Sequence, residues 1–281
     1  MGYREREFDR AKQLGVYRIA FIGDSFAFGQ GIAERERISN ILEAELRQER
    51  SGVEVLNFGR PGYNTADEVR VLRTEVLPTV APDFVLLQWY FNDVELKQPQ
   101  VDASVGNTLE VERDRVNELK QMMLNKSVIY FLLADLSHRV RAKVGMGYAE
   151  EMVSRTAGSG GQEILEAKMA MVEFLRLCKE KNVPVAVLLV PDLAPLGARP
   201  YPFTSLHLNV LEWCRQEGVT CVDLFPVFEP YLRDSAKCET LWVNRFDAHM
   251  SALANRLATT RLLEVFGPVW KAGQSMSPSS S

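Results

Sequence analysis

The chain has 281 residues, of which 46% are hydrophobic and 25% are charged, and its formal net charge is -4. This composition is ordinary for a soluble globular protein, and the length fits one α/β core domain that carries an insertion. An acidic balance argues against nucleic acid as the main partner, because phosphate binding needs a concentrated basic surface.

Cysteine and histidine are sparse. The four cysteines form no CxxC pair, so we expect buried thiols rather than a disulfide framework or a zinc site. Three histidines leave little material for a metal site, and no cofactor is expected. No apolar run reaches the roughly 18 residues of a membrane span, and the charged N-terminus lacks the apolar core of a signal peptide. As written, the chain is expected in the cytoplasm; a longer natural chain would place it in the periplasm or on a membrane anchor.

In the first half of the chain, apolar runs alternate with helical patterns, which is typical of βαβ units and a parallel sheet. After a lead-in over residues 1–16, the predicted elements are a strand (17–22), a helix (38–48), a strand (53–58), a helix (65–78) and a strand (84–89). A capping box between Thr65 and Glu68 is expected to begin the second helix, and Pro78 to end it.

The second half predicts a helix (163–181), a strand (183–191), a helix (205–217), a strand (220–224) and a helix (251–266). The first of these helices places along one side Ile164, Leu165, Lys168, Met169, Val172 and Leu175, and its methionines are expected to fill the core. Residues 97–160 have charged helical patterns and exceed the usual crossover length, so they are interpreted as a helical insertion. This insertion is either a lid or partner surface or a solvated decoration without a role. The core domain spans residues 17–266, and residues 267–281 are expected to be disordered.

Four short polar segments lie where a doubly wound sheet places its ligands, beyond the carboxyl ends of strands. They are Gly23-Asp24-Ser25, residues 57–64, Phe91-Asn92-Asp93 and Asp247-Ala248-His249. Each segment alone is a common turn or loop. Their order and their shared position at strand ends argue against chance.

These segments contain the parts of a nucleophilic site. A serine hydroxyl such as that of Ser25 needs a base to remove its proton during attack. His249 is the candidate base, because an imidazole can take up and return a proton near neutral pH. Asp247 would hold its tautomer and stabilise the imidazolium. The other histidines fit less well, since His138 lies in the insertion and His207 in a predicted helix.

Together the segments resemble the sequence blocks of the SGNH/GDSL hydrolase family, over residues 17–95 and 183–266. The resemblance implies a three-layer α/β/α sandwich with a flavodoxin-like, five-stranded parallel sheet. It also implies an oxyanion hole made by the N–H groups of Ser25 and Gly59 and the side-chain amide of Asn92. At Gly59, the missing Cβ is expected to let the acyl group approach the backbone.

Two positions depart from the family pattern. Tyr90 stands where the family usually has glycine, and we expect its ring to crowd the acyl pocket or to form an aromatic side of it. Met250 stands where proline often follows the histidine, which changes the stiffness of the backbone more than the chemistry. The absence of a GxSxG motif argues against an α/β-hydrolase fold.

The leading hypothesis is hydrolysis of oxygen esters, acyl or acetyl, through an acyl-enzyme. The substrate would be a small ester or an acylated carbohydrate or lipid. An O-acyltransferase or deacetylase acting on a polysaccharide is the alternative, because sequence does not separate water from a sugar hydroxyl as the acceptor. A flavodoxin-like binding module is disfavoured, since Asp24 would repel a phosphate in the loop after the first strand. A catalytically inactive scaffold is disfavoured by the intact serine, histidine and aspartate.

Overall fold

The computed structural model describes residues 3–94, 161–193, 201–231, 234–245 and 247–272, so the predicted insertion at 97–160 lies outside the described residues. Five parallel strands form one sheet: β1 (Tyr17–Gly23), β2 (Val53–Gly59), β3 (Phe84–Trp89), β4 (Val185–Leu189) and β5 (Thr220–Asp223). Their order in the sheet is β2-β1-β3-β4-β5. This is the flavodoxin-like order that was predicted, and its switch point lies between β1 and β3.

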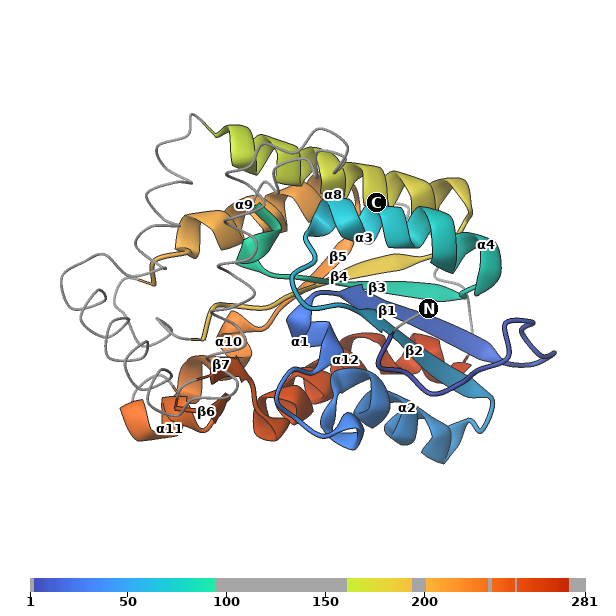
Figure 1. The fold of residues 1–281 in the computed structure, drawn as a ribbon, viewed down its shortest axis with the longest axis horizontal. Helices are drawn as coiled ribbons and strands as arrows, with labels where there is room; N and C mark the ends of the chain where they lie inside the picture. Colours follow the sequence, from blue (N-terminus) through green and yellow to red (C-terminus); the bar gives the residue numbers. More distant parts are fainter. Residues whose placement is uncertain (1–2, 95–160, 194–200, 232–233, 246, 273–281) are drawn as a thin grey trace, which may run out of the picture. The chain divides into compact units, whose positions relative to one another are not determined.

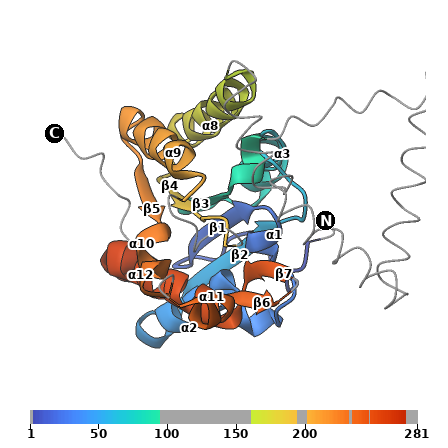
Figure 2. The same cartoon turned by 90° about the vertical axis from the view of Figure 1, so that its left-hand side faces the viewer.

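Helices cover both faces of the sheet, which confirms the three-layer prediction (Figures 1 and 2). One face carries α2 (Ile38–Glu49) and α12 (Ala252–Ala272), and the other carries α3 (Thr65–Val71), α8 (Gln162–Glu180) and α9 (Thr204–Gln216). The remaining short helices are α1 (Ser25–Phe28), η1 (Glu34–Glu36), η2 (Leu72–Val76), α4 (Leu77–Thr79), η3 (Phe91–Val94), α10 (Phe225–Phe228), η5 (Glu229–Tyr231) and α11 (Ser235–Glu239). A separate antiparallel hairpin consists of β6 (Trp242–Asn244) and β7 (Asp247–Met250).

Helix α12 is longer than predicted. It continues past Phe266 to Ala272, with Pro268 inside the helix. The ring of Trp270 is fully buried and lies 5.3 Å from the ring of Phe84 on β3. Burial of one large aromatic side chain stabilises a fold by roughly 2–3 kcal/mol, enough to hold the last turns against the sheet in spite of the proline.

The apolar side predicted for α8 is wrong except at Leu175. The structure buries Ala167, Met171, Phe174, Leu175 and Cys178. Leu165 and Met169, which were expected in the core, are 51% and 63% exposed. The helix has apolar residues on more than one side, and packing against the sheet selects the side that carries the bulky Phe174.

The start and end of α3 also differ from the prediction. Asn64 is the N-cap and forms the capping box with Asp67, one residue earlier than the predicted pair. The hydroxyl of Thr65 instead donates to Asp93 at 2.8 Å. The helical path does not stop at Pro78, because a π turn (η2) leads into α4, whose first turn contains the proline. A missing N–H costs little in a first turn.

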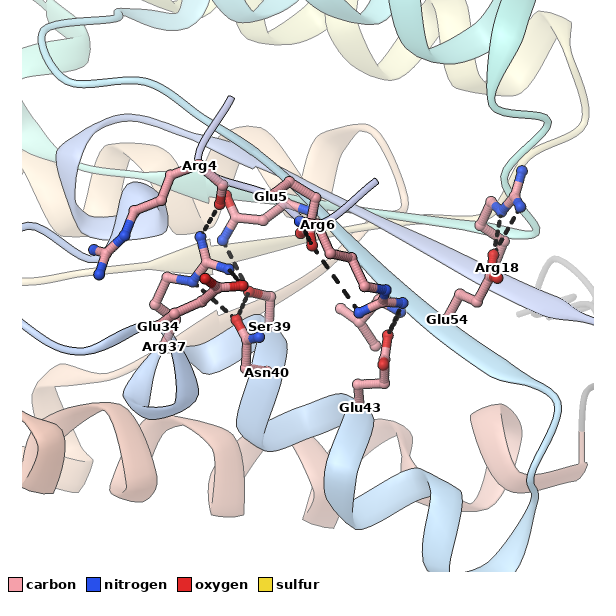
Figure 3. A network of polar contacts seen from close by, with 12 residues as sticks. Arg4, Glu5, Arg6, Arg18, Glu34, Arg37, Ser39, Asn40, Glu43 and Glu54 are labelled. Atoms are coloured by element: carbon pink, nitrogen blue, oxygen red, sulfur yellow. Dashed lines mark hydrogen bonds and ion pairs between the residues drawn. The ribbon is translucent and has the colours of Figure 1, made fainter. Parts of the chain in front are cut away.

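Strand β2 is an edge strand, and carboxylates occupy its outer N–H groups. The Val55 N–H donates to Glu43 of α2 at 2.7 Å, and the Asn57 N–H donates to Glu5 at 2.8 Å. Glu5 belongs to residues 3–12, called the N-terminal segment below. Arg6 of this segment pairs with Glu43 at 2.8 Å (Figure 3). The segment is thus attached to the edge of the sheet by partly buried polar contacts.

The cysteines and the possible metal ligands form no alternative site among the described residues. All four cysteines are free, and three of them, Cys178, Cys214 and Cys238, are buried. Within the described ranges, no three histidine, cysteine, aspartate or glutamate residues gather closely enough to hold a metal ion. In the same part of the chain, no helix has the length and apolar character that a membrane crossing requires.

Candidate active site

Ser25 begins the one-turn helix α1, which follows β1 directly. Asp24 is the N-cap of this helix, and its carboxylate accepts the N–H of Phe26 at 2.9 Å. The N–H of Ser25 has no acceptor among the described residues. A helix N-terminus points such unpaired N–H groups outward, so this one is available to a ligand.

Two buried amide side chains hold the nucleophile turn in place. Gln88, fully buried on β3, accepts the N–H groups of Asp24 and Ala27, each at 3.1 Å. Asn57 on β2 donates to the carbonyl of Ala27 at 2.7 Å. Gly23 is required here, because a Cβ at this position would lie 2.4 Å from Gln88 Oε1. Gln88 was not among the predicted site residues, although a single polar residue inside an apolar strand indicates a buried polar role.

His249 and Asp247 lie on β7 rather than in the loop that was expected. Residues two apart on a strand point to the same face, which brings the two side chains together. The Nδ1 atom of His249 lies 2.5 Å from Asp247 Oδ1, and its Nε2 lies 2.9 Å from Ser25 Oγ. The structure therefore brings together the three side chains that the sequence singled out, across more than two hundred residues of chain.

Hydrogen bonds from His249 lower the pKa of the Asp247 carboxyl. Burial raises the pKa of its carboxyl, but the hydrogen bonds from the side chain and N–H of His249 outweigh burial, and the pKa lies below its usual value. Asp247 is consequently ionised at neutral pH. An ionised carboxylate at Nδ1 fixes the imidazole tautomer that leaves Nε2 free to accept a proton from Ser25.

Aromatic rings surround the imidazole on one side. The ring of Phe26 lies 4.8 Å from that of His249, and the ring of Tyr90 lies 4.3 Å from that of Phe26. Burial raises the pKa of Tyr90 well above its usual value, and the charges of Asp192 and Asp24 raise it further. Tyr90 is thus a neutral hydrogen-bond donor to Asp192, and its ring packs on the residue next to the nucleophile.

Two buried carboxyls, Asp24 and Asp93, interact with each other beside the turn of Ser25. Burial raises the pKa of Asp24 to about 6, although a backbone N–H and the side chain of Asn92 offset part of this effect. Burial also raises the pKa of Asp93 well above its usual value, and the charge of Asp24 raises it further. Asp93 accepts the N–H of Tyr90 at 2.7 Å and the hydroxyl of Thr65 at 2.8 Å. These bonds fix the turn η3, which carries Asn92.

Asn92 lies in η3, just beyond β3, and its side chain neighbours Asp24. Since Asp24 immediately precedes Ser25, the amide of Asn92 lies close to the nucleophile turn. Its Oδ1 is buried without a hydrogen-bond partner among the described residues. The arrangement leaves the NH₂ end of Asn92 on the side of Asp24 and the N-terminus of α1.

Gly59 does not have the surroundings that were expected for an oxyanion donor. Its N–H donates to Asn57 Oδ1 at 2.8 Å. A Cβ at Gly59 would lie 2.4 Å from the backbone nitrogen of Phe28. The missing Cβ therefore lets α1 pack against the end of β2, and the expectation that it admits an acyl group is corrected. In the next turn, Gly62 has φ +75° and open space around its Cα.

The other sequence candidates lie elsewhere. His207 is buried on α9, where its Nδ1 is 3.4 Å from Asp223 Oδ1, so it belongs to a different contact. His138 lies outside the described residues. Met250 is buried at the end of β7.

Comparisons with known proteins place the chain in a protein family. Residues 21–257 match the GDSL-like lipase/acylhydrolase family. No curated protein matches the sequence. Among solved structures, a catalytic mutant of the acetylxylan esterase Axe2 from Geobacillus stearothermophilus aligns with a TM-score of 0.56 at 14% identity, over 92% of this chain and 98% of that chain. TesA aligns with a TM-score of 0.55 at 11% identity, over 90% of this chain and 99% of that chain.

A lipolytic G-D-S-L protein from Veillonella parvula aligns with a TM-score of 0.52 at 12% identity, over 90% of this chain and 99% of that chain. At identities this low, the solved structures support the fold alone. The family match covers most of the sequence and therefore supports membership of the family. With the five-stranded sheet and the family match in agreement, the chain belongs to the GDSL-like lipase/acylhydrolase family and is a hydrolase that acts on ester bonds.

Proposed function

We propose that the protein hydrolyses oxygen esters through a Ser25–His249–Asp247 triad and an acyl-enzyme. The observation that carries the proposal is the 2.9 Å contact between Ser25 Oγ and His249 Nε2, with Asp247 on the opposite ring nitrogen. His249 takes the proton of Ser25 as Oγ attacks the ester carbonyl, and returns it to the departing alcohol. Water then attacks the acyl-enzyme with the same proton transfer and releases the acid.

The oxyanion of the tetrahedral intermediate needs hydrogen-bond donors near Oγ. We assign this role to the N–H of Ser25, which has no acceptor among the described residues, and to the amide of Asn92. Because the N–H of Gly59 already has an acceptor, the backbone of Gly62 is the better candidate for a third donor. The N–H of Arg60 donates to the carbonyl of Gly23 at 3.0 Å, which attaches the start of the Gly62 turn to the residue before Asp24.

Asn92→Ala should lower kcat by about 100- to 1000-fold, since removal of one oxyanion donor costs roughly 3–4 kcal/mol of transition-state stabilisation. The nucleophile and base are unchanged, so a fluorophosphonate probe should still label Ser25. Steady-state hydrolysis of p-nitrophenyl acetate measures the rate. A kcat close to wild type would remove Asn92 from the oxyanion hole.

A short acyl group, such as acetyl, is the substrate group that we propose. The rings of Phe26 and Tyr90 fill the space beside the imidazole of His249, which supports a small acyl group over a long chain. Two of the solved structures with this fold are named acetylxylan esterases, and this adds acetylated carbohydrate to the substrates worth testing. Transfer to a sugar hydroxyl uses the same acyl-enzyme, so product analysis with and without added alcohol distinguishes hydrolysis from transfer.

The experiment that tests the proposal is active-site labelling. Wild-type protein treated with a fluorophosphonate probe should carry one adduct on Ser25, located by peptide mass spectrometry, and lose esterase activity in proportion. Ser25→Ala should not be labelled. Ser205→Ala, which removes an exposed helical serine, is the matched control and should be labelled like wild type. Labelling at another residue, or full activity of Ser25→Ala, would contradict the serine mechanism.

A further inference from the structure

Arg4 of the N-terminal segment contacts the backbone that leaves the nucleophile turn. Its guanidinium donates to the carbonyls of Gly29 and Ile32, each at 2.8 Å, and lies 5.6 Å from the ring centre of Phe28. Gly29 closes α1 in a left-handed conformation with φ +73°. Arg4 therefore holds both ends of the loop of residues 29–32, which begins where the helix of Ser25 ends.

A second arginine, Arg37, contacts the backbone of Arg4 (Figure 3). Arg37 is fully buried, and its guanidinium donates to the carbonyl of Arg4 and to Asn40 Oδ1 at 2.8 Å. It also forms an ion pair with Glu34 at 3.2 Å. A Cβ at Gly29 would lie 2.4 Å from Arg37 Cγ. A buried guanidinium needs such partners, so Arg37 fixes the backbone of Arg4, and its side chain packs closely against Gly29.

The loop also contacts the hairpin that carries the acid–base pair. Gly31 lies against β6, where a Cβ added to it would meet Val243 Cγ1 at 2.7 Å. β6 pairs with β7, the strand of Asp247 and His249. The loop of residues 29–32 thus contacts both the N-terminal segment and the β6–β7 hairpin that carries His249. It follows directly after α1, the helix that carries Ser25.

We infer that Arg4 is a positioning residue that keeps Ser25 at hydrogen-bond distance from His249. The inference rests on the proposed triad. Helix α1 is a single turn, too short to be stable by its own hydrogen bonds, so its orientation depends on the contacts of the chain on either side. Gln88 and Asn57 hold the turn itself, and Arg4 supplies two charge-assisted hydrogen bonds to the chain that follows it.

Arg4→Ala should lower kcat for p-nitrophenyl acetate by about 10- to 100-fold, because a misplacement of about 1 Å between reacting groups has a cost of this order. KM should change by less than about threefold, since Arg4 touches the loop of residues 29–32 rather than the oxyanion donors. The second-order rate of Ser25 labelling by the fluorophosphonate should fall in parallel with kcat. Arg4→Lys should recover part of both rates, because an ammonium can still donate to one of the two carbonyls.

Arg10→Ala is the matched control. It removes the same charge from the same segment, but the side chain of Arg10 is exposed. Its kcat and labelling rate should equal those of wild type. Circular dichroism and the thermal midpoint are measured for each variant, and if Arg4→Ala does not fold, Arg4→Lys and Arg4→Gln decide the question.

Three outcomes would overturn the inference: a kcat of the folded Arg4 variants within twofold of wild type, an equal loss in Arg10→Ala, or a loss confined to KM. Failure of the proposed function has a different signature. In that case wild type itself is not labelled on Ser25, whereas each of the three outcomes above leaves wild type labelled there.

Discussion

Replacement of His249 by alanine should lower kcat for ester hydrolysis by about 10⁶-fold, the largest effect of any single substitution in this protein. Without the imidazole 2.9 Å from its Oγ, Ser25 keeps its proton during attack and the departing alcohol receives none. The Ser25→Ala variant should lose a similar factor. Because the two residues act as a unit, the double variant should be no slower than either single variant.

Steady-state hydrolysis of p-nitrophenyl acetate, with the concentration of folded enzyme determined independently, measures these rates. His207→Gln is the control for loss of a buried imidazole, because His207 contacts Asp223 rather than the nucleophile. It should retain wild-type kcat per folded molecule. Additive losses in the double variant would show that Ser25 and His249 act in separate steps and would contradict the triad.

Asp247→Asn should lower kcat by about 10⁴-fold with little change in KM. An asparagine amide at this position can donate to Nδ1 of His249 and thereby stabilise the tautomer that carries its proton on Nε2. In that tautomer the imidazole cannot accept the proton of Ser25. The side chain at position 247 would still contact His249 Nδ1, now 2.5 Å from Asp247 Oδ1, but it would donate the hydrogen bond instead of accepting it.

Stability against pH checks the same contact independently. The pKa of Asp247 lies below its usual value in the folded protein, so its ionised form contributes stability above the ordinary carboxyl pKa. That contribution is lost as the pH falls through the lowered value. Asp247→Asn should lack this part of the acid dependence, whereas Asp234→Asn, at the exposed N-cap of α11, should keep it. An Asp247→Asn variant with wild-type kcat would show that His249 needs no carboxylate partner.

The strands of the sheet and the polar segments that follow them could be predicted from the sequence, because each strand and each segment has a clear local pattern. β3 and β4 are nearly continuous apolar runs, as expected for strands buried on both faces. Polar segments directly after β1 and β3 indicated where the chain leaves the sheet. The alternation of strands and helices then restricts the topology to right-handed crossovers, which places those segments at one edge.

Other features depend on contacts that no local pattern encodes. The hairpin β6–β7 has strands of three and four residues with little apolar character, so Asp247 and His249 were expected in a loop. The role of Gly59 depends on how closely α1 approaches β2, and the buried side of α8 depends on which apolar face meets the sheet. In each case tertiary packing decides between alternatives that are equally acceptable in sequence.

The carboxylates of Glu5 and Glu43 have a consequence for the assembly state of the enzyme. They accept two of the outward N–H groups of β2, so the sheet edge has no unpaired donor at Val55 or Asn57. A chain that lacked residues 3–12 would expose the Asn57 donor and leave Glu43 without Arg6. An extended strand from a second molecule could then pair along β2, which is the usual route from an uncovered edge to self-association. We therefore expect residues 3–12, besides contacting the loop of residues 29–32, to protect this edge of the sheet from self-association.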